Sequence, residues 1–264
     1  MNRIEKKFKE LNKANKKAFI AFITAGYPSL ATTEKLILEF AKKGVDIIEL
    51  GVPFSDPLAD GPVIQESSQV ALKKNTHLVD ILKLVRKARK ATDIPICLMS
   101  YYNPIFCFGE ENFVKRAKAS GVDGVIIPDL PPEEASSFIK SANKSGLDII
   151  CFLSPTSTKE RIRFISKISK GFIYYVSLTG VTGARKNLPS DLINKVREIK
   201  KHTPKPVCVG FGVSKDFQVK QIYKFADGVI VGSAIVKKIK ENIGKPDLVK
   251  KIGNFVYKLK GPRS

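Results

Sequence analysis

The stretch AKKGVDIIELGV, at residues 41–52, carries the pattern on which our fold prediction rests. It reads as the end of a helix, a glycine, a short aliphatic link, an aspartate and then a strand. The same pattern recurs as AKASGVDGVII (117–127) and ANKSGLDIICF (142–152). Glycine suits the left-handed position that ends a helix, and so short a link is typical of the turn from a helix into a parallel strand. The repeat therefore predicts helices and strands in alternation.

Eight runs rich in aliphatic, β-branched and aromatic residues are spread along the chain. They are AFIAFITAG (18–26), VDIIELGV (45–52), IPICLMSYY (94–102), VDGVIIPDL (122–130), LDIICFLSP (147–155), FIYYVSLTG (172–180), PVCVGFGVS (206–214) and ADGVIVGSA (226–234). Such continuous apolar runs indicate strands buried on both faces, as in a parallel sheet. Stretches with helical spacing lie between them, for example at 33–43, 79–90 and 111–120.

Eight strands alternating with helices in 264 residues match a (β/α)8 (TIM) barrel. A doubly wound open sheet is the alternative, but TAGYPS (24–29) stands where its GxGxxG would follow the first strand. No linker divides the chain, so we expect one domain over residues 1–264. An extra amphipathic helix is predicted at residues 2–14, where it would close the bottom of the barrel. Its apolar stripe consists of Ile4, Phe8 and Leu11.

The charge balance first suggests a nucleic-acid-binding protein. Lys and Arg number 46 against 25 Asp and Glu, a formal net charge of +21. The basic residues gather, however, on expected helix faces near the two ends of the chain and at 83–90, while the expected barrel mouth is acidic. We therefore expect no nucleic-acid binding, and two other roles for the charge: solubility, or steering of an anionic substrate or an acidic partner.

Compartment and metal binding can be judged from a few residue types. The chain has four cysteines, Cys97, Cys107, Cys151 and Cys208. They form no CxxC pair and no Cys–His cluster with metal-ligand spacing, so we expect reduced, mostly buried thiols, a cytoplasmic protein and no metal. No apolar run reaches the roughly 18 residues of a membrane span, and the Lys-rich N-terminus lacks the apolar core of a secretory signal.

In a parallel barrel, reactive residues lie at the carboxyl ends of the strands. Glu49 ends the second run, where a carboxylate is costly unless it faces the polar barrel mouth, and burial would raise its pKa toward that of a general acid. A structural carboxylate is the alternative. The long loop expected between this run and residue 94 opens with GVPFSDPLADGP and adds Asp56 and Asp60, between which the pattern does not choose. Other strand ends supply polar residues without an assigned role, namely Tyr101, Asn103, Asp129 and Tyr174.

Small residues end the last two runs. GFG (210–212) ends the seventh, and Gly232 and Ser233 end the eighth before a helical segment. Backbone N–H groups and a helix N-terminus can approach an anion there, which predicts a phosphate site that needs no Lys or Arg. GVTG (180–183), after the sixth run, would either contribute to the same phosphate site or form a mobile flap. No lysine lies at a strand end, which argues against Schiff-base chemistry.

The segment ELGVPFSDPLADG (49–61) closely resembles the signature of the tryptophan synthase α subunit family. Other segments similar to that family are FITAGYPS (22–29), YYNPIF (101–106), IIPDLP (126–131), LSPTS (153–157), SLTGVTGAR (177–185), VGFGVS (209–214) and GVIVGSAIV (228–236). The resemblance covers essentially the whole chain. It implies a (β/α)8 barrel that cleaves indole-3-glycerol phosphate to indole and glyceraldehyde 3-phosphate.

By this resemblance, Glu49 would be the catalytic acid–base and Asp60 its partner, leaving Asp56 as a structural or partner-contact residue. The implied substrate-binding residues are Phe22, Met99, Ile126, Tyr174, Thr182, Gly183, Phe211, Gly212, Gly232 and Ser233. The first three would line the indole pocket, with Tyr174 nearby. Thr182 would close onto Asp60, and the glycines with Ser233 would hold the phosphate. Many relatives have Arg where this sequence has Val70, a departure that bears on packing or regulation more than on activity.

The family works with a pyridoxal-phosphate β subunit that receives indole through a tunnel in an α2β2 complex. The resemblance therefore implies a β-subunit partner, which the loops at 53–57 and 103–106 would face, and no cofactor in this chain. Two other activities stay open. One is an α-like chain that serves mainly to activate the partner, against which the intact Glu49 and Asp60 argue. Another phosphosugar barrel enzyme, such as an indole-glycerol-phosphate synthase, would be expected to place lysine at strand ends.

Overall fold

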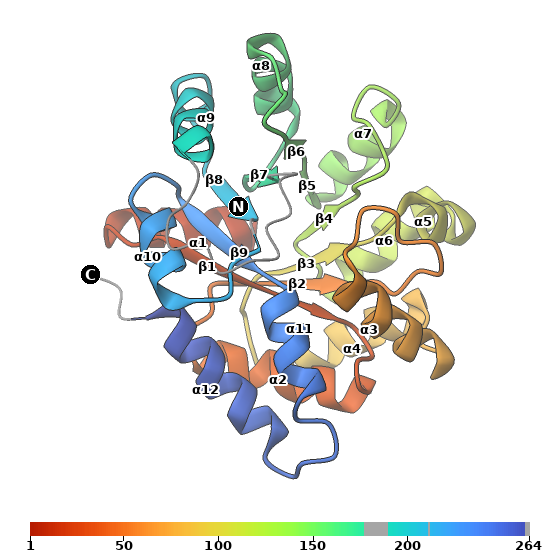
Figure 1. Cartoon of the computed structure of the whole chain (residues 1–264). Coiled ribbons are helices and arrows are strands. Elements are labelled where there is room, and N and C mark those ends of the chain that lie inside the picture. The colour runs from red at the N-terminus through yellow and green to blue at the C-terminus, as the bar shows by residue number, and fades with distance from the viewer. Residues whose placement is uncertain (177–189, 211, 262–264) are drawn as a thin grey trace.

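The computed structural model describes residues 1–176, 190–210 and 212–261, which form a parallel sheet surrounded by helices (Figure 1). The strands are β1 Ala18–Thr24, β2 Ile47–Gly51, β3 Ile96–Met99, β4 Gly124–Ile126, β5 Asp148–Ile150, β6 Phe152–Leu153, β7 Ile173–Val176, β8 Val207–Gly210 and β9 Gly228–Val231. The helices are α1 Arg3–Lys13, α2 Leu30–Lys42, α3 Pro62–Lys73, α4 Leu78–Ala88, α5 Tyr102–Phe108, α6 Glu110–Ser120, α7 Ser136–Ser145, α8 Lys159–Ile168, α9 Ser190–Lys201, α10 Asp216–Tyr223, α11 Ser233–Lys240 and α12 Leu248–Lys260.

The sheet closes on itself. Its hydrogen-bonded order is β5-β4-β3-β2-β1-β9-β8-β7-β6, so it begins and ends with two strands that only Cys151 separates in the chain. The backbone N–H of Cys151 donates to the Ser169 hydroxyl at 3.1 Å, which interrupts the strand at that point. The eight predicted runs therefore form the predicted (β/α)8 barrel, with the fifth run divided into β5 and β6.

The connection from β2 to β3 differs from the long loop that the sequence suggested. Residues 62–73 form α3, which begins at Pro62 after Gly61, and α4 covers most of the predicted helical stretch. Proline fits the first position of a helix because its missing N–H would have no partner there. The loop at the barrel mouth is therefore only residues 52–61, here named the β2–α3 loop.

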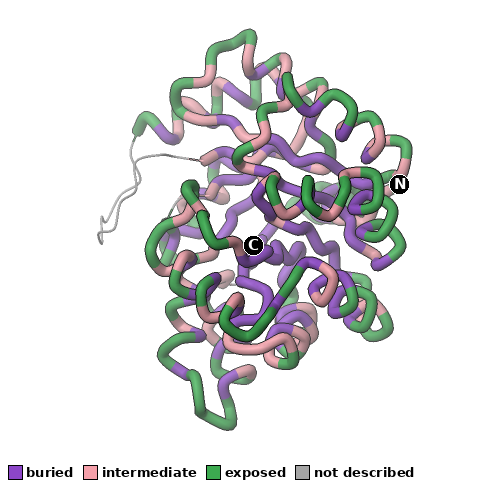
Figure 2. Tube along the Cα trace, turned by 90° about the vertical axis from the view of Figure 1, so that its right-hand side faces the viewer, coloured by how far each residue is buried: buried purple, intermediate pink, exposed green. Residues whose placement is uncertain are grey.

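Burial separates an apolar interior from an exposed outer layer (Figure 2). One cluster fills the barrel itself, and a larger one lies between the strands and the outer helices. The first cluster includes Ile4, Phe8 and Leu11 of α1, packed against strand residues such as Ile20, Ile47 and Phe172. The N-terminal helix thus closes one end of the barrel, as predicted.

Three aspartates that precede a strand join it to the neighbouring strand. Asp46 and Asp123 belong to the repeated pattern, and Asp227 precedes β9. The pairs are Asp46 with Phe19, Asp123 with Ile96, and Asp227 with Val207. In each pair the carboxylate accepts the partner's backbone N–H, at 2.7, 2.9 and 3.0 Å, while the aspartate's own N–H donates to the partner's carbonyl. These reciprocal bonds fix the register at the start of three strand pairs, and register determines which side chains face the barrel interior.

Asp123 also anchors two arginines. Its carboxylate accepts from Arg89 at 2.7 Å and from Arg3 of α1 at 3.1 Å, and the side chains of Asp123 and Arg89 are only 2% and 10% exposed. Removing one partner of a buried ion pair leaves the other charge desolvated and unpaired. Arg3 forms a second ion pair at 3.3 Å with Asp93, whose side chain is 92% exposed.

We predict that Asp123→Ala lowers the free energy of unfolding by about 3–5 kcal/mol, because it strands the buried Arg89. The matched control, Asp93→Ala, removes a carboxylate from the same Arg3 and should cost less than about 1 kcal/mol, because that pair is solvated. Urea denaturation of both variants checks this. Equal losses of unfolding free energy in the two variants would show that the buried ion pairs of Asp123 do not stabilise the fold more than the exposed pair does.

Candidate active site

Glu49 lies inside the barrel near the carboxyl end of β2. It is 1% exposed, and register places it beside Phe22 of β1 and Cys97 of β3. Within the described part of the chain, neither of its carboxyl oxygens has a hydrogen-bond partner. Burial, and then the nearby charge of Asp60, raise the pKa of Glu49 to about 8. The carboxyl group is therefore mainly protonated at neutral pH and can act as an acid.

Asp60, in the β2–α3 loop, is the second carboxylate at this mouth. Its Oδ2 accepts a hydrogen bond from the Tyr101 hydroxyl at 3.1 Å. Burial raises the pKa of Asp60 to about 6, and the Tyr101 hydrogen bond acts in the opposite direction. Asp56 instead is exposed and accepts from the Ser55 hydroxyl. The geometry thus brings Asp60 to Glu49, and their different surroundings separate the two pKa values.

Apolar side chains surround the Glu49 carboxyl. The Phe22 ring occupies the space that side chains at two glycines would need: a Cβ at Gly51 would lie 2.6 Å from it, and one at Gly232 would lie 3.2 Å from it. Tyr174 packs against Phe152, with ring centroids 4.9 Å apart. Met99 lies opposite Ile126 in the β3–β4 register. Ile126 belongs to the barrel core, and Met99 packs against it. Of the expected indole-pocket residues, all four therefore lie inside the barrel.

The expected phosphate-binding residues are only partly described. Gly232 immediately precedes α11 and Ser233 is its first residue, with no side chain capping the helix N-terminus. Gly212 follows β8 and has a positive φ of 37°. Thr182, Gly183 and Phe211 lie outside the described residues. The structure thus places a glycine-rich helix N-terminus at the carboxyl end of β9, where an anion could be bound.

Tyr101 is one of the strand-end residues to which the sequence pattern assigned no role. It follows β3, is 5% exposed, and contacts the β2–α3 loop through both its ring and its hydroxyl. The sequence signals were its position at a strand end and its place in the segment YYNPIF (101–106), and neither gives its side chain a role. A tyrosine there is compatible with ordinary packing, so the contact with Asp60 becomes visible only in three dimensions.

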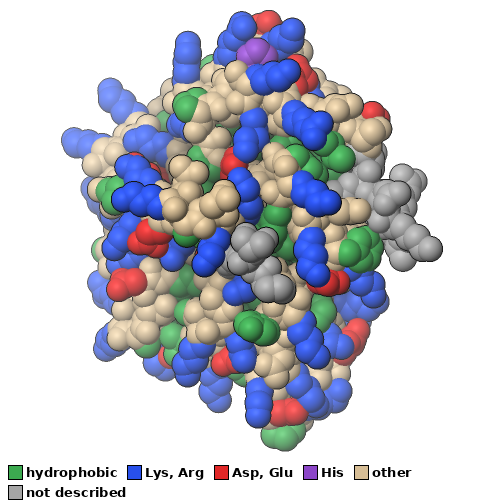
Figure 3. Space-filling view, turned by 90° about the vertical axis from the view of Figure 1, so that its left-hand side faces the viewer, with side chains coloured by type: hydrophobic (Ala, Val, Ile, Leu, Met, Phe, Trp, Pro, Cys, Tyr) green, Lys and Arg blue, Asp and Glu red, His purple; other side chains and the backbone are tan. Residues whose placement is uncertain are grey.

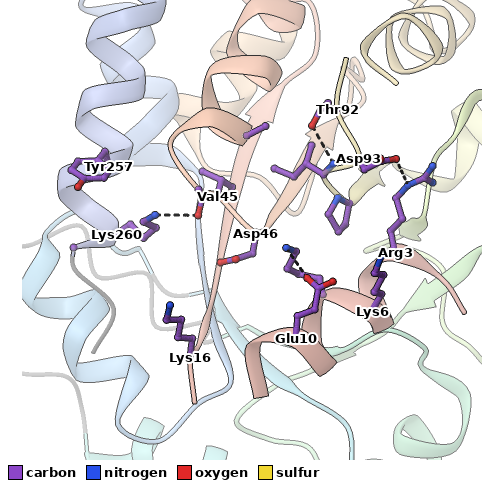
Figure 4. A pocket seen from close by; sticks show the side chains of 16 residues that line it. Arg3, Lys6, Glu10, Lys16, Val45, Asp46, Thr92, Asp93, Tyr257 and Lys260 are labelled. Carbon is purple, nitrogen blue, oxygen red and sulfur yellow. Dashed lines mark hydrogen bonds and ion pairs between the residues drawn. The ribbon is translucent and has the colours of Figure 1, made fainter. Parts of the chain in front are cut away.

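A hollow of about 810 Å³ lies at the opposite, amino end of the strands (Figure 4). Its rim carries charged side chains from α1 and from the end of α12, and several of these are engaged locally. Lys7 pairs with Glu10 at 3.1 Å, Arg3 pairs with Asp93, and Lys260 donates to the carbonyl of Lys43. In (β/α)8 enzymes this end contributes stability, so we do not place the active site there.

The positive charge is distributed over the outer surface. On the face in Figure 3, Lys and Arg side chains are scattered between acidic and apolar ones and do not gather in one groove. Within the described residues, no helix is long and apolar enough to cross a membrane. The same residues contain no group of three or more His, Cys, Asp or Glu side chains that could hold a metal ion.

Two smaller expectations can be compared with the structure. Cys97, Cys151 and Cys208 are free and buried, as their apolar runs suggested, whereas Cys107 is free and exposed. Val70, the one departure from the family pattern that the sequence suggested, lies in α3 and packs against the core between strands and helices. An apolar residue is therefore well accommodated at this position.

Comparison with known proteins agrees with this arrangement. Residues 8–260 match the sequence profile of the family described as tryptophan synthase alpha chain. The chain is 52% identical to the tryptophan synthase alpha chain of Geotalea uraniireducens, over 98% of this chain and 97% of that one. The crystal structure of tryptophan synthase subunit alpha from Legionella pneumophila superposes with a TM-score of 0.92 at 39% identity, covering 98% and 97% of the two chains. A chain of the Pyrococcus furiosus tryptophan synthase complex has a TM-score of 0.86 at 38% identity, covering 94% and 99%. The chain belongs to the tryptophan synthase alpha chain family.

Proposed function

We propose that Glu49 and Asp60 carry out the acid–base chemistry of the family's lyase reaction, the cleavage of indole-3-glycerol phosphate to indole and glyceraldehyde 3-phosphate. One observation carries this assignment: a buried carboxyl group without a hydrogen-bond partner lies beside a second carboxylate with a lower pKa. Such a pair provides one acid and one anion at the same pH.

Each carboxyl group has a distinct task in the proposed mechanism. The reaction is a retro-aldol cleavage, and an indole carbanion would be a poor leaving group. Protonated Glu49 delivers a proton to indole C3, and Asp60 stabilises the positive charge that develops at the indole N–H. The Glu49 carboxylate then accepts the proton of the glyceryl hydroxyl. As the carbon–carbon bond breaks, its electron pair returns to the ring and neutral indole departs.

The substrate would lie across the mouth of the barrel. Phe22, Met99, Ile126 and Tyr174 would contact the indole ring, because they occupy inward positions around Glu49. The backbone at the start of α11 would bind the phosphate, with Gly232, Ser233 and Gly212 contributing. Thr182, Gly183 and Phe211 remain predictions from the family resemblance.

We further propose that the partner is a pyridoxal-phosphate β subunit, in an α2β2 complex through which indole is passed on. Apolar side chains at the expected contact loops support this. Leu58 is 94% exposed at the β2–α3 loop, and Phe106 is 63% exposed on α5. Burying apolar side chains of this size against a partner would be favourable. The free cysteines fit a reducing compartment, so we place the chain in the cytoplasm.

We predict that Glu49→Gln and Asp60→Asn each lower the rate of indole release by at least about 100-fold, because each removes one member of the acid–base pair. Asp56→Asn is the matched control from the same loop. Without a β subunit, it should release indole at the wild-type rate. Indole release from indole-3-glycerol phosphate is measured with and without a β subunit. A wild-type chain that stimulates the β subunit without releasing indole would instead favour the activator function.

We also predict a bell-shaped dependence of kcat/KM on pH. Activity should rise as Asp60 ionises near pH 6 and fall as Glu49 loses its proton near pH 8, and these limbs belong to the coupled pair. Steady-state rates at saturating β subunit provide the measurement. Constant activity from about pH 5 to about pH 9 would contradict the assignment.

A third prediction concerns stability. The folded protein holds a proton on Glu49 up to about pH 8, whereas the unfolded chain loses it near the ordinary value of 4.5. The contribution of Glu49 to the free energy of unfolding should therefore fall as the pH rises between these two values. Glu49→Gln carries no titrating group, so its free energy of unfolding should gain on wild type by up to about 1.4 kcal/mol per pH unit across this window. Urea denaturation at several pH values measures the difference. If the difference in free energy of unfolding between the two proteins stayed constant with pH, folding would not raise the pKa of Glu49, and the prediction would be wrong.

A further inference from the structure

We propose that Tyr101 is a positioning residue, whose hydroxyl orients the Asp60 carboxylate and ties the β2–α3 loop to the end of β3. This inference rests on the proposed role of Asp60 and extends it to a residue of the neighbouring strand. Tyr101 would act through Asp60 and would not itself exchange protons with the substrate.

The backbone around Tyr101 is attached to the next strand of the barrel. The N–H of Ser100 donates to the carbonyl of Ile126 at 3.0 Å, and the N–H of Tyr102 donates to Asp129 Oδ1 at 2.9 Å. Tyr101 lies between these two bonds. Its backbone is therefore held by β3, β4 and the segment after β4.

The side chain of Tyr101 then contacts that loop at three points. Its ring stacks on Phe54, with centroids 5.2 Å apart and planes inclined by 30°. Its hydroxyl accepts a hydrogen bond from the N–H of Ala59 at 2.9 Å and donates one to Asp60 Oδ2 at 3.1 Å. One side chain thus connects an element of the barrel wall to both ends of the loop that carries the carboxylate.

The direction of these hydrogen bonds follows from the groups involved. A backbone N–H can only donate, so the hydroxyl must accept from Ala59, and its single proton is available for Asp60. Burial and the charge of Asp60 raise the pKa of Tyr101 above its ordinary value. The hydroxyl therefore remains a donor throughout the pH range in which the enzyme would work.

The other described hydrogen bonds of Asp60 involve its backbone. Its N–H donates to the carbonyl of Pro57 at 3.0 Å, and its carbonyl accepts from Gln65 Nε2 at 2.9 Å. These two bonds hold the main chain and do not by themselves orient the carboxylate. The Tyr101 hydroxyl selects one orientation and favours the ionised form, opposing the effect of burial on the pKa of Asp60.

The test is Tyr101→Phe, which removes the hydroxyl and keeps the ring on Phe54. Tyr102→Phe is the matched control, because it removes an adjacent hydroxyl that donates to Glu110 at 2.7 Å. The pH profile of kcat/KM for indole release is measured with the β subunit present. Tyr101→Phe should lose about 10-fold at pH 7 and its acidic limb should move up by about one pH unit, whereas Tyr102→Phe should match wild type.

A merely structural tyrosine would lower activity at every pH without moving the acidic limb, and that result would overturn the proposal. If Tyr101→Phe loses all measurable activity, an NMR titration of the Asp60 carboxyl carbon decides, since it needs no turnover. An unchanged titration would also refute the proposal.

The double variant separates this inference from the function on which it rests. Adding Tyr101→Phe to Asp60→Asn should cause no further loss, because the tyrosine acts through that carboxylate. Independent, additive losses would refute the positioning role and leave that of Asp60 intact. Full activity of Asp60→Asn alone would refute the proposed role of Asp60, and the role of Tyr101 with it.

Discussion

The reciprocal hydrogen bonds between Asp46 and Phe19 set the arrangement on which the candidate site depends. They begin the pairing of β2 with β1 only three residues before Glu49. Side chains alternate between the two faces of a strand, so a shift of one residue would turn Glu49 out of the barrel and an aliphatic side chain into its place. Equivalent bonds from Asp123 and Asp227 fix two other strand pairs. The same short pattern that builds the sheet therefore also directs the acid toward the mouth.

Once Glu49 faces inward, its surroundings determine its chemistry. Phe22, Tyr174 and the barrel core exclude water, and the described residues provide no hydrogen bond to the carboxyl oxygens. Loss of solvation raises the pKa of Glu49, whereas Asp60 lies in a loop and receives a hydrogen bond that favours its ionised form. Two carboxyl groups at one mouth thus differ in protonation because one sits in an apolar core and the other beside a donor. A neutral acid and an anion at the same mouth follow from the deeper burial of Glu49 and from the hydrogen bond to Asp60.

Much of this was predictable from local pattern. The eight apolar runs marked the strands because fully buried parallel strands have continuous apolar sequences, and α1 followed from its stripe at Ile4, Phe8 and Leu11. Glu49 stood out because a carboxylate in such a run needs a special explanation. The interruption at Cys151 depends on the hydroxyl of the distant Ser169, which accepts a hydrogen bond from the Cys151 N–H, and α3 begins where proline and glycine suggested only a loop. Asp56 and Asp60 have equivalent sequence contexts, so only the family resemblance favoured Asp60, and the contact with Tyr101 required the folded chain.

The central claim is that Glu49 remains protonated at neutral pH because it is buried without a hydrogen-bond partner. The most direct measurement is an NMR titration of the protein with carbon-13 at the glutamate carboxyl groups, using Glu49→Gln to assign the signal. We predict that the Glu49 signal titrates near pH 8, well above the other glutamates. A signal that titrates near the ordinary value of 4.5 would show that the carboxyl group is solvated or ionised in the folded protein, and would contradict this account.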